Sequence, residues 1–491
     1  MNTSRVSSSF YSSAQLFKIY MQLRRVSGII GKFLQIYAVL TLVPVVVAVI
    51  YSEPLINIIL FVFSGAITLV TGTLLVITGN AEEPSVQEAI FSTVFGWVLA
   101  VLIGAIPLTH YMIPLDAVFE SMAGLTTTGI SLLLEPSRLP HSMLFWRSFM
   151  QWIGGLGILT FFIAVIRESG GISQRLFSAE AHKTDPGSIR PSLMKSIIDL
   201  WRVYGFITTL MIGIYMALGM DGFNAVIHSF SGLSTGGFSS SSASMAAFNT
   251  AIQTVTVLFM FVGGVNFVLL YMVLRGDIKP FFKNSEFKLY TGIFLLATAL
   301  TGYGLISQMG VQQAVLNASF QAAAVISSTG YSIMSITDLS VPLQIFFLAL
   351  MFVGGSLGST AGGLKVFRLL TMFKLLKTRL RSYTLPKTAV NKVKIDGEIL
   401  RDDSVKTISV LLFTWVAVTF TSGMAIVAMD GVSFLGGLSA AVSAAGNMGP
   451  VFFSAQELVN LSIGSKLVLI IGMLAGRLEM LPLLALLNKK I

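Results

Sequence analysis

The chain contains no cysteine and few charged residues. The absence of cysteine excludes disulfides, thiolate metal sites, iron–sulfur clusters and cysteine nucleophiles. Only 11% of the 491 residues are Asp, Glu, Lys or Arg, whereas soluble domains carry about a quarter. No pair of acids, Ser-His-Asp set or metal-ligand cluster recurs within the apolar segments, so the sequence does not predict an enzyme. An ordinary soluble protein is excluded as well.

Apolar residues make up 54% of the chain and are concentrated in long segments. A helix needs about 20 mostly apolar residues to cross a bilayer. The segments that reach this length are 33–51, 54–78, 88–108, 145–168, 197–219, 250–274, 288–308, 342–376, 405–428 and 463–488. They predict an all-α polytopic membrane protein with about ten transmembrane helices.

The formal net charge of +10 does not indicate nucleic-acid binding, because no nucleic-acid motif accompanies it. Basic residues instead collect in alternate loops, as expected for loops on the cytoplasmic side. These residues include Arg24, Arg25, Arg167, Arg175, Arg190, Lys195, Arg275, Lys279, Lys374, Arg379, Arg381 and Lys394. The pattern predicts that both termini are cytoplasmic and that the first residues are a cytoplasmic tail rather than a removed signal peptide.

The opposite loops are nearly free of basic residues, with Arg138 the clear exception, and contain several acids. The acids are Asp116, Glu120, Asp221, Asp338 and Asp430. Two interpretations stay open. Together the acids could form a negative vestibule that concentrates cations, or each could be an ordinary acid in a loop near water.

Four stretches of moderate apolarity lie between the long segments and are too short to cross a bilayer, which predicts re-entrant helices. They occupy residues near 115–126, 222–234, 311–327 and 433–446. A glycine follows each one, and the four surrounding sequences align without gaps. These glycines are Gly129, Gly237, Gly330 and Gly449, at intervals of 108, 93 and 119 residues. The repetition predicts four units of span, re-entrant pore helix and span around a central pore, preceded by two leading spans.

The expected domain boundaries follow from these repeats. They are a cytoplasmic N-terminal tail at 1–32, two leading transmembrane helices at 33–80, pore repeat one at 85–170, pore repeat two at 195–277, pore repeat three at 286–380, a cytoplasmic linker at 381–404 and pore repeat four at 405–491.

The residues around each repeated glycine suit a selectivity filter. Glycine adopts positive φ without strain, so successive carbonyl oxygens can face one axis and replace the water around a dehydrated ion. Neighbouring hydroxyls can add ligands or brace the strand from behind. The predicted filter residues are Thr127, Thr128, Gly129, Ile130, Thr235, Gly236, Gly237, Phe238, Ser328, Thr329, Gly330, Tyr331, Asn447, Met448 and Gly449. The carbonyl ends of the four short helices would add a favourable potential for a cation.

A second glycine-rich stretch interrupts the unusually long apolar segment 342–376. Helix there costs about 1 kcal/mol per glycine relative to alanine, so the segment is expected to unwind. Exposed backbone at membrane depth needs a water-filled cavity or other protein around it. The predicted gate comprises Gly354, Gly355, Gly358, Ser359, Thr360, Gly362, Gly363 and Lys365, together with Arg477 in the last span. Close packing of helices through small residues is the alternative.

Three motifs and the four filter stretches resemble the Trk/Ktr/HKT superfamily of potassium transporters, and most closely its TrkH branch. The motifs are Trp146-Arg-Ser-Phe-Met-Gln-Trp-Ile-Gly-Gly-Leu-Gly157, Phe352-Val-Gly-Gly-Ser-Leu-Gly-Ser-Thr-Ala-Gly-Gly-Leu-Lys365 and Gly476-Arg-Leu-Glu479. The resemblance covers residues 30 to 491, and the two leading spans match this branch rather than the shorter KtrB form.

The resemblance implies a homodimer in a bacterial or archaeal cytoplasmic membrane, with one pore in each chain. Potassium is then the substrate and binds at the filter only, and the chain holds no organic cofactor. The resemblance also implies a cytoplasmic TrkA-like ring that binds the regulatory nucleotide. Some sodium-carrying relatives have serine where this chain has Gly129, so the glycine indicates potassium selectivity. Membrane lipid is the remaining expected partner, and nucleic acid is not.

Several single residues carry more than one interpretation. Arg477 is a pore-lining barrier by the resemblance, whereas pairing with Glu479 or anchoring a dimer is the alternative. Arg147 and Gln151 are expected to brace pore helices, and His228 is expected to be a buried, hydrogen-bonded histidine. The basic stretch from Lys365 to Lys394 would contact lipid or a regulatory partner.

The sequence therefore predicts potassium uptake through a single-chain filter of four repeats, gated by the intramembrane loop and a cytoplasmic subunit. The alternatives are a sodium- or proton-coupled potassium symporter and a less selective monovalent cation pathway.

Overall fold

The computed structural model describes residues 4–80, 85–168, 193–384, 386, 392–478 and 480. Glu479 and parts of the predicted inner segments therefore lie outside the described residues. The chain divides into two units, one formed by residues up to 114 and one by residues 115–484. Helices dominate both units, and the only strands within the described ranges form one short hairpin.

The first unit contains α1 (Ser4–Thr41), α2 (Val43–Ile50), α3 (Leu55–Thr78), α4 (Val86–Ala105) and the 3₁₀ helix η1 (Ile106–His110). Helices α1 and α3 approach closely at Gly31 and Gly72, because a Cβ on Gly31 would lie 2.6 Å from the Gly72 carbonyl oxygen. An ion pair of 2.8 Å between Arg25 and Glu88 joins α1 to α4. Helix α1 begins well before the predicted span 33–51, so the predicted tail is partly helical.

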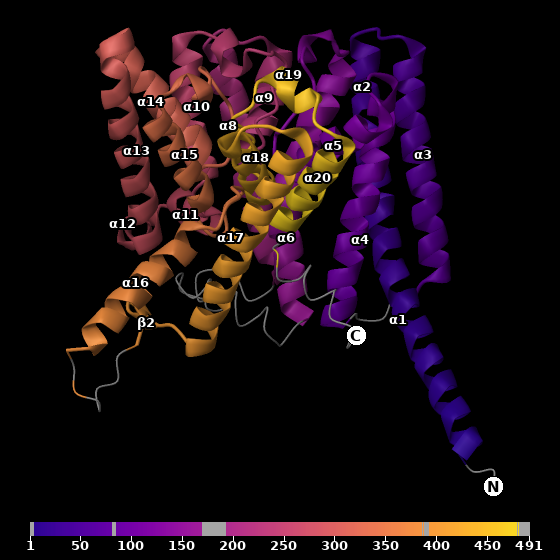
Figure 1. The fold of residues 1–491 in the computed structure, drawn as a ribbon. Coiled ribbons are helices and arrows are strands. Elements are labelled where there is room, and N and C mark those ends of the chain that lie inside the picture. Colours follow the sequence, from indigo (N-terminus) through magenta and orange to yellow (C-terminus); the bar gives the residue numbers. More distant parts are fainter. Residues whose placement is uncertain are drawn as a thin grey trace. The chain divides into compact units, whose positions relative to one another are not determined.

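The second unit contains the four repeated glycines. Its helices and strands are α5 (Pro114–Leu125), η2 (Pro136–Arg138), α6 (His141–Glu168), α8 (Leu193–Ala217), α9 (Gly222–Leu233), η3 (Ser244–Ala247), α10 (Thr250–Gly263), α11 (Phe267–Leu274), α12 (Lys279–Lys283), α13 (Ser285–Met309), α14 (Val311–Ile326), η4 (Ile336–Asp338), α15 (Val341–Val353), α16 (Val366–Ser382), β1 (Lys394–Ile395), β2 (Glu398–Ile399), α17 (Asp402–Asp430), α18 (Phe434–Gly446), α19 (Ala455–Val459) and α20 (Ile463–Arg477). Figure 1 shows the long helices α8, α13 and α17 with the short helices α9, α14 and α18 among them.

Six helices of the described residues are long and apolar enough to cross a membrane, and a bent pair would make a seventh. The chain is thus a multi-pass, mostly helical membrane protein. Two of the predicted apolar segments are interrupted, and the sequence predicted the interruption only for segment 342–376. Segment 250–274 breaks between α10 and α11 with a bend of 107°, and segment 342–376 breaks between α15 and α16.

The first break has a local cause that the sequence interpretation missed. Gly263 and Gly264 lower the helix preference at the end of α10. Asn266 then caps α11, because its side-chain oxygen accepts the Val268 N–H at 2.8 Å. A side-chain cap starts a new helix at a new angle, so the apolar segment turns instead of continuing.

The four short helices coincide with the four stretches predicted to be re-entrant. Two begin at side-chain caps, where Asp221 accepts the Asn224 N–H and Ser433 accepts the Gly436 N–H. All four are buried along most of their length and end just before a repeated glycine. Long helices therefore surround short ones, which places the glycine segments inside the unit.

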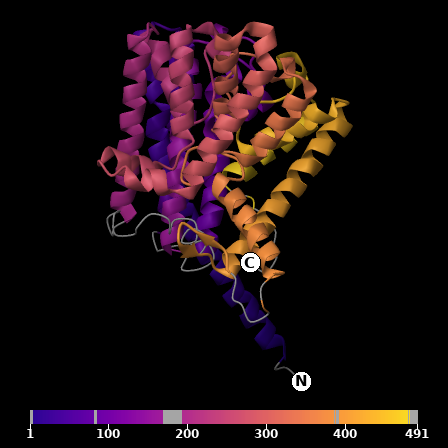
Figure 2. The ribbon, with the colours of Figure 1, turned by 90° about the vertical axis from the view of Figure 1, so that its left-hand side faces the viewer.

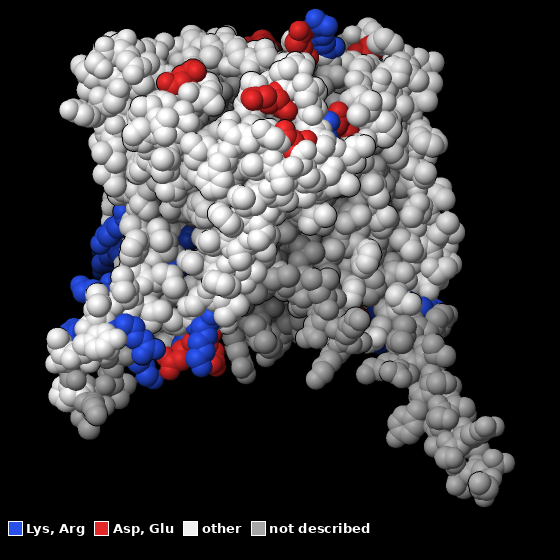
Figure 3. Space-filling view, in the orientation of Figure 1, with Lys and Arg blue, Asp and Glu red and all other residues white. Residues whose placement is uncertain are grey.

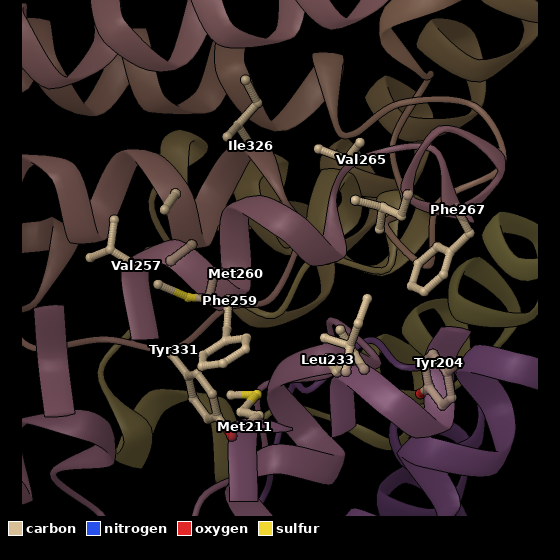
Figure 4. Packing of buried hydrophobic residues seen from close by; sticks show 14 of the residues in the cluster. Tyr204, Met211, Leu233, Val257, Phe259, Met260, Val265, Phe267, Ile326 and Tyr331 are labelled. Atoms are coloured by element: carbon tan, nitrogen blue, oxygen red, sulfur yellow. The ribbon is translucent and has the colours of Figure 1, made fainter. Parts of the chain in front are cut away.

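Buried side chains of α8, α9, α10 and α14 hold these short helices in place. Tyr331 lies beside Met211 and Phe259 in this cluster (Figure 4). Gly232 of α9 faces the same point, since a Cβ there would lie 2.6 Å from the Met211 methyl carbon. Apolar side chains on the outer faces, including Leu295 and Leu300 of α13, remain exposed, as expected for a surface covered by lipid.

Helix α16 and the β1–β2 hairpin extend at one end of the second unit (Figures 1 and 2). The strands are antiparallel, with Lys394 opposite Ile399. Lys and Arg gather at this end beside a few acids, whereas the other end shows mainly Asp and Glu (Figure 3). This distribution agrees with the charge asymmetry of the loops.

Candidate functional site

The four repeated glycine segments meet in a closed ring. A Cβ atom added to each glycine would touch the backbone of the next segment, and the fourth segment returns to the first. The contacts are those of Gly129 with Gly236, Gly237 with Thr329, Gly330 with Met448, and Gly449 with Thr128. Segments about a hundred residues apart in sequence are thus neighbours around one axis, and the last segment in the chain lies beside the first.

The ring segments share one backbone conformation. In each, a first residue and the glycine two positions later have positive φ. The pairs are Thr127 (φ 53°) with Gly129 (77°), Thr235 (56°) with Gly237 (79°), Ser328 (56°) with Gly330 (76°), and Asn447 (49°) with Gly449 (95°). Only glycine adopts this region without strain, which explains why glycine stands at the crowded third position.

Hydrogen bonds orient the ring backbone. The N–H of the middle residue donates to a carbonyl oxygen in the last turn of the preceding short helix at 2.8–3.0 Å. The pairs are Thr128 with Ala123, Gly236 with Ser231, Thr329 with Ala324, and Met448 with Ser443. Among the described residues no protein donor reaches the carbonyl oxygens of residues 127–129, 235, 237, 328–330 and 447–449. The N–H groups of the middle residues thus donate to the short helices, and most carbonyl oxygens of the ring accept no hydrogen bond from the described residues.

Side chains brace the ring from behind. The Thr128 hydroxyl lies 2.8 Å from the Thr126 hydroxyl, and Thr329 makes the same contact with Ser327 at 2.7 Å. The Asn447 amide donates to the Thr128 hydroxyl at 2.9 Å and so joins the fourth segment to the first. The side chains of Thr128, Thr329 and Asn447 are thus hydrogen-bonded to other side chains of the protein.

Arg147 and Gln151 of α6 connect the first two segments. Gln151 donates to the Gly236 carbonyl oxygen at 2.7 Å and accepts the Phe238 N–H at 3.2 Å. Arg147 forms a buried ion pair of 2.6 Å with Glu120 of α5. It also donates to the Ser239 carbonyl oxygen at 3.3 Å and lies over the Phe238 ring. Both side chains therefore position the ring.

The predicted gate residues form a non-helical loop directly against the ring. The Gly362 N–H donates to the Ser328 hydroxyl at 2.6 Å, and the Gly363 N–H donates to the Gly446 carbonyl oxygen at 2.8 Å. The Thr360 hydroxyl lies 3.0 Å from the Leu233 carbonyl oxygen and 3.1 Å from the Gly263 carbonyl oxygen, and its one proton can be donated to either. The loop thus contacts the ends of helices from repeats two and four and a ring residue of repeat three.

The bend between α10 and α11 provides the other partners of the loop. The Ser356 N–H donates to the Gly264 carbonyl oxygen at 2.9 Å, and the Phe267 N–H donates to the Gly358 carbonyl oxygen at 3.0 Å. Irregular backbone within a membrane protein is tolerated where other protein satisfies it. Each helix break therefore supplies hydrogen-bond partners to the other.

Arg477, at the end of α20, is buried and touches this loop. Its guanidinium donates to the Thr360 carbonyl oxygen at 3.4 Å and to the Gly154 carbonyl oxygen of α6. The Nε atom has no hydrogen-bond partner among the described residues. The Lys365 ammonium, at the other end of the loop, donates to the Ala361 carbonyl oxygen. Arg477 thus places a positive charge between the loop and α6.

The five acids that the sequence analysis assigned either to a negative vestibule or to ordinary loops can now be placed by their contacts. Glu120 is fully buried and pairs with Arg147, and Asp116 pairs with Lys466 of α20 at 2.8 Å. Asp221 caps α9, and Asp430 accepts the Ser462 N–H at 3.0 Å. These contacts give four of the five acids a structural role, because each carboxylate forms an ion pair or accepts an N–H hydrogen bond within the chain.

His228 is buried and bonded at both ring nitrogens, as the sequence interpretation expected. Its Nδ1 lies 2.8 Å from the Asn224 carbonyl oxygen, and its Nε2 lies 3.0 Å from the Ser239 hydroxyl. Sequence reasoning missed Glu286, a buried acid in the first turn of α13. An acid at the start of an apolar span was the available signal.

The chain matches the family model of TrkH, described as a cation transport protein, over residues 57–491. It is 29% identical to the Trk system potassium uptake protein TrkH of Escherichia coli K12, over 95% of this chain and 98% of that protein. It is 30% identical to an uncharacterized cation transporter of Methanocaldococcus jannaschii, over 93% of this chain and 94% of that protein. The crystal structure of the potassium transporter TrkH from Vibrio parahaemolyticus matches with a TM-score of 0.84 at 28% identity, covering 95% of this chain and 99% of that one.

Proposed function

The chain belongs to the TrkH family of cation transport proteins, and from this membership we propose that it carries potassium ions into the cell through the ring of four glycine segments. The family and fold are those of a transporter, not an enzyme, in agreement with the sequence prediction. Relatives of similar length carry the name potassium uptake protein, which supports potassium as the transported ion.

One observation carries the proposal, namely the closed ring in which most carbonyl oxygens lack a donor from the part of the chain that the structure describes. Carbonyl oxygens around an axis can replace the hydration shell of a potassium ion. The short helices also end at the ring, and their carbonyl ends bring about half a negative charge each. Both effects favour a cation without any side-chain carboxylate in the path.

The glycine loop is the proposed gate, with Arg477 as its electrostatic part. The loop bonds to the ends of α9, α10 and α18, so its displacement would open the space next to the ring. A positive charge there raises the energy of a passing cation, by about 2 kcal/mol at about 10 Å with an effective dielectric constant of about 20. Moving the loop and Arg477 together would remove both obstacles.

The proposed assembly is a homodimer in the cytoplasmic membrane, with both termini inside and a nucleotide-binding ring of regulatory subunits on the inner face. The relatives are named as parts of a Trk system, which supports further subunits. The basic end of the second unit, around α16 and the hairpin, would face the cytoplasm and the anionic lipid there.

Growth of a potassium-uptake-deficient bacterium at low potassium tests the transport function. We expect the chain to restore growth, and vesicles containing it to take up rubidium down its gradient. Uptake that needs neither sodium nor a proton gradient supports the channel-like mechanism, whereas a strict requirement for either ion supports a coupled symporter. No growth and no rubidium uptake by a chain that is present in the membrane would contradict potassium transport.

Arg477→Gln tests the proposed gate. We expect passive rubidium uptake to rise about tenfold, because the substitution removes the charge that opposes the cation. Arg401→Gln is the matched control, since Arg401 is exposed at the start of α17. Equal uptake by the Arg477→Gln protein and the unaltered protein would refute the barrier role.

A further inference from the structure

One buried carboxylate holds both sides of the glycine loop. The Oε1 atom of Glu286 accepts the Leu357 N–H at 2.7 Å and the Phe367 N–H at 3.1 Å. Leu357 lies within the loop, and Phe367 lies in the first turn of α16, just after it. The Glu286 side chain is only 2% exposed. A single oxygen atom thus connects a residue within the loop to the helix that follows the loop.

These two hydrogen bonds are strong for their type. Bonds to a charged acceptor contribute more than bonds between neutral groups. The loop is also held by backbone hydrogen bonds to Gly264 and Gly446, and its residues Gly354, Gly358 and Gly363 have positive φ. The Glu286 contacts therefore add a charge-assisted restraint to the segment that bonds to Ser328 and Gly446.

The residue before Glu286 is held by the cytoplasmic linker. The Asp396 carboxylate accepts both the N–H and the hydroxyl of Ser285. Asp396 and Gly397 have φ of 50° and 89° and form the turn between β1 and β2, as expected for an Asp-Gly hairpin turn. The hairpin turn, the start of α13 and the glycine loop are thus consecutive links in one chain of polar contacts.

An apolar cluster runs parallel to these polar contacts. Leu357 of the loop packs in the same cluster as Phe367 of α16, Ile395 of β1 and Val405 of α17. Leu289, one turn after Glu286 on α13, packs against it. Because protein cores are close-packed and transmit displacement, a movement of the hairpin or of α16 would also displace Leu357.

We propose that Glu286 is the positioning residue that keeps the glycine loop closed, and that the β1–β2 hairpin controls it through the contact between Asp396 and Ser285. This inference rests on the proposed function of the loop as a gate. A cytoplasmic regulator that shifts the hairpin would then loosen Glu286 and free the loop. The hairpin therefore receives the regulatory movement, and Glu286 connects the hairpin to the glycine loop.

Thiol labelling tests whether Glu286 holds the loop closed, without any transport measurement. The natural chain has no cysteine, so Ser359→Cys provides a single reporter on the buried loop. We expect Glu286→Ala to raise the maleimide labelling rate about tenfold and Glu286→Gln to raise it less, because the amide keeps an acceptor oxygen. Asp402→Asn is the matched control, as Asp402 is an exposed acid in the first turn of α17. Equal labelling rates in Ser359→Cys alone and in its combinations with the three other substitutions would overturn the role of Glu286.

Cross-linking tests the hairpin. In a Ser285→Cys/Asp396→Cys protein, a short bifunctional thiol reagent should fix the hairpin on α13. We expect rubidium uptake by the double variant to fall at least about fivefold when a cleavable reagent cross-links it, and to recover after cleavage. Adding the reagent to either single variant should not alter the uptake rate that this variant has without the reagent. Uptake that is the same with and without the cross-link would overturn the proposal that the hairpin controls the gate. An unaltered protein that takes up no rubidium contradicts the proposed function instead, and the labelling rates still decide whether Glu286 holds the loop.

Discussion

Gly129→Ser is expected to lower the preference for potassium over sodium about tenfold or more. Gly129 has φ of 77°, and a Cβ there would overlap the Gly236 carbonyl oxygen. A non-glycine residue in such a conformation stores about 1–3 kcal/mol of strain, and the overlap forces the two segments apart. A displaced ring holds the smaller and larger ions with less discrimination, because its oxygens no longer match one ion. Competition between sodium and rubidium for uptake measures the ratio.

Gly205→Ser is the matched control for this substitution. Gly205 lies within α8, and a Cβ built there has no heavy atom within 4 Å. We expect its selectivity to equal that of the unaltered protein. If Gly129→Ser also kept full selectivity and uptake, the ring could not be the filter, because a backbone change at its tightest contact would have had no effect.

Arg147→Gln is expected to reduce the free energy of unfolding by about 3–5 kcal/mol. Arg147 and Glu120 form an ion pair whose side chains are 2% and 0% exposed, and removing one partner leaves a buried charge uncompensated. Glu120→Gln should have a similar effect for the same reason. The melting temperature of the detergent-solubilised protein, followed by tryptophan fluorescence, provides the measurement.

The pair formed by Arg138 and Glu135 is a natural control, because both side chains are exposed, at 79% and 53%. Exposed pairs contribute about 0–1 kcal/mol, so Arg138→Gln should leave the melting temperature nearly unchanged. Replacing Arg147 and Glu120 together by Met and Leu should be less harmful than either single change. A single substitution at Arg147 that behaved like Arg138→Gln would show that the buried pair does not stabilise the ring.

Local patterns in the sequence predicted the short helices well. The stretch near 222–234 became α9 (Gly222–Leu233), and that near 433–446 became α18 (Phe434–Gly446). Caps, apolar content and the following glycine are all local signals, so a single sequence contains them. The helix interruption after Val353 followed from glycine content for the same reason.

Long-range partners were not predictable in the same way. Asp116 and Lys466 are 350 residues apart in the chain, yet they form an ion pair. The sequence interpretation assigned Asp116 and Glu120 either to a negative vestibule or to ordinary loops, and named no partner for them. Nothing near either residue in the chain identifies its partner, because the pairing depends on which helices pack together.

The sequence by itself determined the membrane class, the four glycine repeats and the family, because apolar length, composition and spacing are properties of the chain alone. Only the tertiary structure decided that Gly449 returns to Thr128 and closes the ring, and that Glu286 accepts N–H groups on both sides of the glycine loop. Hydrogen bonds and close contacts need atoms within about 3–4 Å. Residues distant in the chain reach that separation only when the helices carrying them have packed.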